Sequence, residues 1–200
     1  MVRGPFGGSL KKEIFTTSGY LVYEQNHAIN ADFKFARYFI DEAKYREMKR
    51  FQVLANDLLI SCSGTMGKIA IVPVNHKPGI INQALLKLTV DPKKVLPEYL
   101  KLALESEPIH DQYFRNQSGG VIQNVAYVKV LSQIDVPLPA IDVQRAIVNQ
   151  VTEEQELVAG TKKLMEHYRQ RLRSAIAKVW GDSNVPDSVY ESRNELLEAA

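Results

Sequence analysis

The chain contains 200 residues, of which 45% are hydrophobic and 24% charged, and its formal net charge is +2 at pH 7. This is the composition of an ordinary soluble protein with one compact domain, or one domain plus an extension, and the charge alone does not indicate nucleic-acid binding. The single cysteine, Cys62, excludes an internal disulfide, and no apolar run is long enough to span a bilayer, so a cytoplasmic protein is expected. The histidines lack metal-ligand spacing, and no catalytic, cofactor-binding or metal-binding residue is predicted.

The chain begins with a glycine-rich turn, residues 3–9, which is followed by Lys11 and Lys12. The glycines suit tight turning, and the two lysines could also lie along a phosphate backbone. A short strand is predicted over Gly19–Tyr23. A helix is predicted over Asp41–Arg50, because acids occupy its first turn and bases its last, which matches the helix dipole.

A hairpin is predicted in the middle of the chain, within residues 51–74. Two runs rich in Ile, Leu and Val, Asp57–Ser61 and Lys68–Val72, are joined by a small polar loop. The proline at position 73 ends the second run, because proline cannot donate to a sheet ladder. The loop is either a plain turn or a turn that contacts a polyanion through its backbone amides and three side chains. These side chains are Ser63, Thr65 and Lys68.

The same loop does not fit a nucleotide-binding loop. Such a loop has four residues between its glycines, then Lys and Ser or Thr, and it opens a helix. Here two residues separate Gly64 from Gly67, Ile69 follows Lys68, and a strand is predicted next. Nucleotide binding is therefore not the preferred interpretation of this loop.

The next elements are a strand, a helix and a polar segment. A single strand is predicted over Ile80–Val90, in which Asn82 and Gln83 are either buried hydrogen-bonding residues or readers of base edges. A helix is predicted from Glu98 to about Phe114. The following segment suits DNA reading, since amide side chains pair bidentately with adenine and Arg with guanine; the alternative is an ordinary solvated loop. The candidate readers are Arg115, Gln117, Gln123 and Asn124.

A long helix is predicted over residues 142–179, after an extended segment with two prolines at 134–139. Its apolar residues follow the heptad spacing of a supercoiled helix, and Gly181 would end it. The predicted interface residues are Ile147, Val151, Val158, Met165, Tyr168, Leu172 and Val179. At 1.5 Å per residue the helix is a rod of about 57 Å. No second helix of that length is predicted in the chain, so its partner is expected to be another copy or another subunit.

Three blocks of the sequence together resemble one family. They are GPFGGSLKK at 4–12, IDEAKYREMKRFQVLANDLLISCSGTMGKIAIVP at 40–73, and IDVPLPAIDVQRAIVNQV at 134–151 leading into HYRQRLRSAIAKVWG at 167–181. In order and spacing they are similar to the DNA specificity subunits of type I restriction–modification enzymes. Members of that family typically carry two recognition domains and two long helices, whereas one of each is expected here. No strand is expected before the glycine-rich turn.

The resemblance implies a mixed α/β target-recognition domain at residues 1–139, one long coiled-coil helix at 140–181 and a tail at 182–200. It implies a non-catalytic protein whose partners are double-stranded DNA, a DNA adenine methyltransferase (modification) subunit and a restriction subunit. We expect a homodimer formed through the long helix, without membrane association, in which each chain is a natural half-subunit or a fragment.

Two competing hypotheses are kept. One is the recognition part of a larger methyltransferase or nuclease fusion enzyme. Against it, the sequence contains no Asn/Asp-Pro-Pro-aromatic motif and no glycine-rich adenosylmethionine motif after a strand. The other is a helical scaffold protein that does not contact DNA directly.

Overall fold

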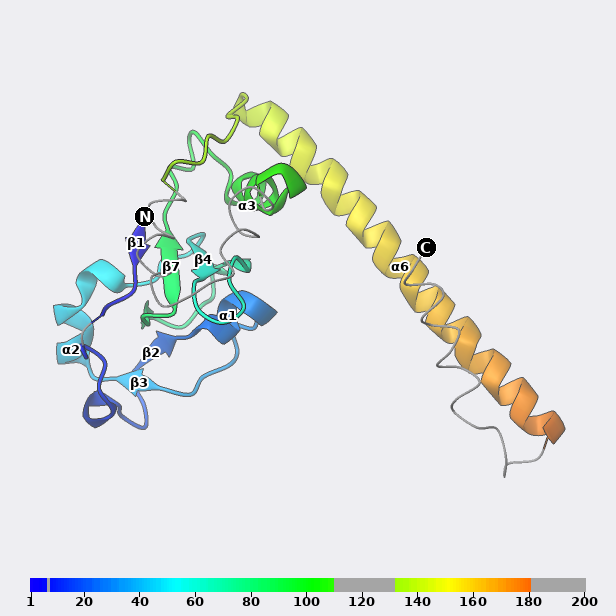
Figure 1. The fold of residues 1–200 in the computed structure, drawn as a ribbon, viewed down its shortest axis with the longest axis horizontal. Helices are drawn as coiled ribbons and strands as arrows, with labels where there is room; N and C mark the ends of the chain where they lie inside the picture. Colours follow the sequence, from blue (N-terminus) through cyan, green and yellow to red (C-terminus); the bar gives the residue numbers. More distant parts are fainter. Residues whose placement is uncertain (7, 110–131, 181–200) are drawn as a thin grey trace. The chain divides into compact units, whose positions relative to one another are not determined.

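The computed structural model describes residues 1–6, 8–109 and 132–180, and the chain forms two compact units, Met1–Val148 and Asn149–Ala200. The first unit is a mixed α/β domain built on two small sheets (Figure 1). A long helix, α6 (Ile141–Trp180), begins in the first unit and forms the described part of the second. The predicted fold class, a mixed α/β domain followed by one long helix, is therefore confirmed.

The first sheet has the strand order β1-β7-β4-β5, and each neighbouring pair is antiparallel. Its strands are β1 (Val2–Arg3), β4 (Leu58–Ser61), β5 (Ile69–Ile71) and β7 (Leu85–Leu88). β4 and β5 form the predicted hairpin. The expectation that no strand precedes the glycine-rich turn is wrong, because β1 pairs with the outer edge of β7 through Val2 opposite Lys87 and Arg3 opposite Leu86.

The second sheet has the strand order β3-β2-β6. Its strands are β2 (Tyr20–Tyr23), β3 (Phe39–Ile40) and β6 (Gly79–Ile81). β2 is antiparallel to β3 and parallel to β6. Gly79 allows this parallel approach, because a Cβ atom at its position would lie 2.1 Å from the carbonyl oxygen of Leu21.

The other helices of the described residues are α1 (Gln25–Asn30), α2 (Glu42–Glu47) and α3 (Pro97–Glu105), with 3-10 turns at Lys12–Ile14 and Lys49–Phe51. Asp41 caps α2 by accepting a 2.7 Å hydrogen bond from the amide of Lys44. The predicted helix Asp41–Arg50 is interrupted at the buried residue Met48. α3 ends before its predicted end, because Ser106 is extended and its hydroxyl donates a 2.7 Å hydrogen bond to the carbonyl of Ala103.

The prediction of a single strand over Ile80–Val90 is wrong, because the chain changes sheets inside this segment. β6 lies in the second sheet and β7 in the first. Between them, the side chain of Asn82 accepts a 2.9 Å hydrogen bond from the amide of Ala84, and this local turn redirects the chain. Both strands are buried and apolar, so the run of apolar residues gives no sign of the change.

The first sheet lies between α3 and the second sheet. Successive side chains of a strand point to opposite faces: Ile60 of β4 packs with Leu100 and Leu104 of α3, whereas Leu59 packs with Tyr23 of the second sheet. The far face of the second sheet buries a third cluster, made of Val22, Ile40, Met48 and Ile80. Layered burial of this kind, at about 25 cal/mol per Å² of apolar surface, is the main stabilising contribution to the domain.

A buried ion pair lies within the first sheet. The side chains of Lys87 and Asp57 are 9% and 0% exposed, and Lys87 Nζ lies 3.7 Å from Asp57 Oδ2. Asp57 also accepts hydrogen bonds from the amide of Leu54, at 2.8 Å, and from the hydroxyl of Thr89. Lys87 donates to the carbonyl oxygen of Gln52. These hydrogen bonds offset the cost of taking both charges out of water.

One buried side chain holds the first turns of α6 in the domain. Gln144 is fully buried, and its Oε1 accepts a 2.9 Å hydrogen bond from the amide of Leu96. Its Nε2 donates to the carbonyl oxygens of Lys94, at 2.9 Å, and Pro139, at 2.8 Å. The helix is thereby tied both to the segment before α3 and to the extended segment that leads into it.

We predict that Gln144→Ala lowers the free energy of unfolding by about 2–4 kcal/mol. Three hydrogen bonds of a buried side chain are lost, each contributing about 1 kcal/mol, and the part-buried backbone groups of Leu96, Lys94 and Pro139 lose their partner. Gln150→Ala is the matched control, since Gln150 is exposed on the same helix and donates to the exposed Glu154, so a change below about 0.5 kcal/mol is expected. Urea unfolding followed by circular dichroism measures both; equal losses in the two variants contradict the prediction.

Candidate nucleic-acid interface

The β4–β5 hairpin carries a polar tip that is held in one conformation by Ser61. The buried Ser61 hydroxyl donates a 2.7 Å hydrogen bond to the carbonyl of Thr65 and accepts a 3.0 Å hydrogen bond from the amide of Lys68. Gly64 and Gly67 have φ values of +58° and +78°, a region that favours glycine. The tip is therefore built around positions that other residues do not fill easily.

The three side chains predicted to contact a polyanion at this tip are exposed. They are Ser63, Thr65 and Lys68. No described residue forms an ion pair with Lys68, so its ammonium group is available to a partner. The strand β5 begins directly after Lys68, as the sequence predicts.

Gln25 lies beside the tip, and the sequence analysis did not identify it. A Cβ atom on Gly64 would lie 3.6 Å from Gln25 Nε2. Gln25 is the first residue of α1, a helix that was also missed. The feature of the sequence that marks the start of α1 is the reciprocal cap between Glu24 and His27. In this cap the Glu24 amide donates a 3.0 Å hydrogen bond to His27 Nδ1. Histidine is not the usual partner in such a cap, so the motif is hard to recognise from sequence.

Cys62, between β4 and the tip, is a buried thiol. Burial raises its pKa to about 12, against smaller opposing effects of the Arg3 charge and a backbone hydrogen bond at Leu86. The thiol is therefore protonated and unreactive near neutral pH.

Lys11 and Lys12 are exposed but belong to another part of the domain. They lie at the first 3-10 turn, whose Ile14 packs with the cluster on the far face of the second sheet. The hairpin tip instead packs through Met66 against the cluster beneath α3. Within the described residues, no hydrogen bond or ion pair links these lysines to the tip. The predicted readers Arg115, Gln117, Gln123 and Asn124 lie outside the described residues.

The predicted apolar stripe lies along α6 and is open to solvent. Its members Ile147, Val158, Met165, Tyr168, Leu172 and Val179 are between 38% and 80% exposed, and Val151 is partly buried. Leu157, Leu164 and Trp180 add further exposed apolar surface. A contiguous apolar surface of this kind on a soluble protein marks an interaction site.

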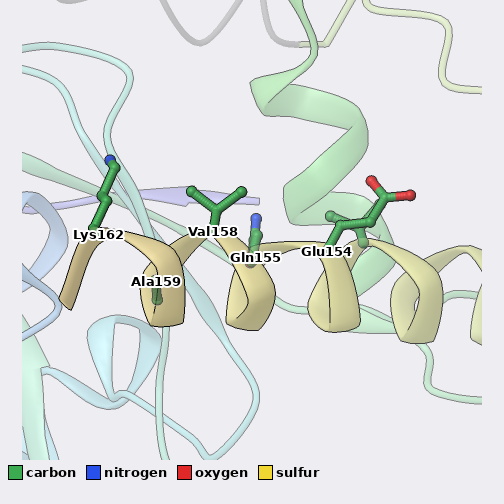
Figure 2. Close-up of a pocket in the computed structure, with 6 residues that line it drawn as sticks. Glu154, Gln155, Val158, Ala159 and Lys162 are labelled. Atoms are coloured by element: carbon green, nitrogen blue, oxygen red, sulfur yellow. The ribbon is translucent and has the colours of Figure 1, made fainter. Parts of the chain in front are cut away.

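A shallow hollow follows one face of this helix. Figure 2 shows Glu154, Gln155, Val158, Ala159 and Lys162 along one stretch of α6. With Val151, they recur at intervals of three and four residues, which is the spacing of one helix face. The described walls of the hollow all come from this one helix, so it resembles a docking face flanked by a carboxylate and an ammonium group more than an enclosed ligand site.

The described residues contain neither a membrane-spanning helix nor a cluster of metal ligands. No helix there combines the length and the apolar character needed to cross a membrane. No group of three or more His, Cys, Asp or Glu side chains is placed to hold a metal ion within the same residues.

A family of known proteins and one of its characterised members match the sequence of this chain. Residues 7–164 match the family described as "Type I restriction modification DNA specificity domain". Over 105 residues the chain is 30% identical to the type I restriction enzyme EcoBI specificity subunit of Escherichia coli, a match that covers 52% of this chain and 22% of that subunit. The chain therefore aligns with about a fifth of the length of this relative.

Two solved structures share the fold. A chain from the work described as "Structural basis underlying complex assembly and conformational transition of the type I R-M system" has a TM-score of 0.64 and 16% identity, covering 87% of this chain and 40% of that one. The HsdS subunit from Thermoanaerobacter tengcongensis has a TM-score of 0.55 and 18% identity, covering 76% of this chain and 40% of the subunit. At these identities the similarity is one of fold.

We predict that Ser61→Ala destabilises the domain by about 1–2 kcal/mol, because a buried hydroxyl that both donates and accepts is removed and its backbone partners lose their bonds. Ser63→Ala is the control, since the Ser63 side chain is exposed at the same tip, and a change within about 0.5 kcal/mol is expected. Both are measured by chemical unfolding. If Ser63→Ala costs as much as Ser61→Ala, the hydroxyl of Ser61 does not hold the tip.

Proposed function

Because this chain belongs to the type I restriction–modification DNA specificity domain family, we propose that it reads one half of a bipartite DNA target without performing chemistry itself. Its α/β domain provides the reader, and its long helix sets the distance to a second reader. Two observations together carry the proposal. The domain has an exposed polar tip that is held in one conformation, and the helix that follows the domain in the sequence, α6, carries an exposed apolar stripe with heptad spacing.

The reading surface is proposed to include the hairpin tip. Ser63 and Thr65 present hydroxyl groups, and Lys68 an ammonium group with no ion-pair partner among the described residues; these groups suit phosphate oxygens and base edges. Lys11 and Lys12 are proposed as additional phosphate contacts on another part of the domain. The polar residues Arg115, Gln117, Gln123 and Asn124 are proposed as base readers, in keeping with their side-chain chemistry.

The long helix is proposed to pair with the same helix of a second copy. In this arrangement residues 1–139 form the recognition domain, 140–181 the spacer helix and 182–200 a tail. Residues seven apart drift by about 20° on a straight helix, so the stripe from Val151 to Val179 stays in one seam only if two helices supercoil. A two-fold pair of readers requires a symmetric, interrupted DNA target, because protein symmetry is matched by target symmetry.

Methyl transfer and cleavage are assigned to partner subunits. We propose that the paired helices present the two recognition domains to a DNA adenine methyltransferase subunit and a restriction subunit. The alternative functions predict different behaviour: a fusion enzyme fragment would transfer methyl groups unaided, and a helical scaffold would leave DNA binding of the assembly unchanged when its recognition domain is altered.

We predict that substitution in the stripe prevents self-association. Leu172→Lys combined with Val158→Lys places charges in the proposed seam, and the dimer dissociation constant should rise at least about 100-fold, since each lost buried aliphatic side chain costs 2 kcal/mol or more. Gln170→Lys adds the same side chain on the opposite face of the helix and should leave the dimer intact. Sedimentation equilibrium distinguishes them; a stable dimer in the double variant contradicts helix pairing.

We predict that Lys68→Ala weakens DNA binding equally for all sequences in the complex of this chain with its methyltransferase subunit. The slope of log affinity against log salt should become shallower by about 1, because one phosphate contact is lost. Lys93→Ala removes another exposed lysine and serves as the control. Fluorescence anisotropy over a salt series measures the slope. If the unaltered complex shows no salt-dependent DNA binding, the proposed function is wrong.

A further inference from the structure

An open groove of about 790 Å³ lies on the first unit, and none of its lining residues is one of the DNA contacts predicted from the sequence. One wall is the turn that follows α1, residues 30–34. The other wall is the connection between β5 and β6, from Ile71 to Lys77. The groove therefore brings together two segments about forty residues apart in the sequence.

The described residues that line the groove carry two ammonium groups and one carboxylate, which leaves an excess of positive charge. Lys34 and Lys77, one on each wall, are exposed, and neither forms an ion pair within the described residues. The one carboxylate of the groove belongs to Asp32. Its Oδ1 accepts hydrogen bonds from the amides of Lys34, at 2.9 Å, and Phe35, at 3.3 Å, which hold the carboxylate on its own turn.

Both walls are fixed to the buried core. His27 Nε2 lies 3.0 Å from the carbonyl oxygen of Phe35, which holds the first wall to α1. On the second wall, the Tyr23 hydroxyl donates a 2.6 Å hydrogen bond to the carbonyl oxygen of Lys77. Burial raises the pKa of Tyr23 to about 12, so this hydroxyl remains a donor throughout the physiological range. His76 Nε2 lies 3.2 Å from the carbonyl oxygen of Val53.

Amide side chains lie beside the charges. Asn75 is exposed on the second wall, and its side chain forms no hydrogen bond with a described residue. Asn30, on the first wall, donates to Asn26 and keeps its own carbonyl oxygen as a further acceptor. A site with unpaired ammonium groups and amides on rigid walls offers the two kinds of contact that a nucleic acid requires, to phosphates and to base edges.

The groove and the hairpin tip lie at opposite ends of α1. Gln25, at the start of the helix, neighbours Gly64 of the tip, and Asn30, at its end, lines the groove. Five residues of helix separate them by about 7.5 Å at 1.5 Å per residue. Two phosphate steps along one DNA strand, at 3.4 Å of helix axis each, span about 6.8 Å, which is similar to this rise, so one strand can contact both places.

We infer that this groove is a second DNA-contact surface of the recognition domain, in which Lys34 and Lys77 bind phosphates and Asn75 reaches a base edge. The inference rests on the proposed function and extends it to residues on the side of α1 away from the hairpin tip. It assigns to α1 the role of joining the two contact surfaces.

The test uses the complex of the full chain with its methyltransferase subunit and a duplex containing its target. Lys34→Ala and Lys77→Ala should each make the salt slope of binding shallower by about 0.9, and the double variant by about twice that amount. Lys77→Arg should restore the slope, because it keeps the charge. Lys49→Ala, an exposed lysine outside the groove, should leave the slope unchanged. Asn75→Ala should change binding at one base pair of the target and leave the slope unaltered.

The possible outcomes distinguish a failure of the groove inference from a failure of the proposed function. If the unaltered complex binds its target and the groove variants keep its slope, the groove makes no contact and the inference is wrong, while the proposed function stands. If Lys49→Ala lowers the slope as much as the groove variants, the effect is one of overall charge, which also overturns the inference. If the unaltered complex binds no DNA, the proposed function itself fails.

Discussion

The hydrogen bonds of the Gln144 carboxamide are the constraint on which the use of the long helix depends. A spacer helix can set the separation of two readers only if its first turn is fixed to a reader. Gln144 provides this because its buried side chain bonds the part-buried backbone groups of two different segments, and a buried carboxamide that loses its partners is costly. Tyr99 of α3 adds a 2.7 Å hydrogen bond to the carbonyl oxygen of Pro137 in the segment that leads into α6.

A buried side chain that forms hydrogen bonds with backbone groups also fixes both candidate contact surfaces. Ser61 fixes the hairpin tip and Tyr23 fixes one wall of the groove, in each case through a buried side chain bonded to backbone. Rigid positioning lowers the entropy that binding must overcome, so short exposed side chains on fixed loops can discriminate between ligands. The exposed residues at these places can then differ between related readers without loss of the underlying fold, because the bonds that fix the loops involve backbone atoms.

The long helix differs from the domain in where its apolar side chains lie. Its surface is polar on most sides, and the apolar stripe from Ile147 to Val179 remains exposed within the described residues. Leaving that much apolar surface in water is unfavourable by roughly 25 cal/mol per Å², so covering the stripe with another apolar surface would stabilise the helix. The domain has the opposite organisation: its apolar residues are buried in three clusters between the two sheets and the helices around them.

The pattern of residues in the sequence was enough to predict the long helix, the β4–β5 hairpin and the start of α2, because these features depend on residues close together along the chain. Only the tertiary structure decided the rest. The change of sheet at Asn82, the burial of Lys87 against Asp57 and the role of Gln144 all depend on partners far away in sequence. The sequence pattern around a polar residue in an apolar run is the same whether the residue contacts solvent, a distant carboxylate or a distant backbone amide. Only the folded structure shows which of these it contacts.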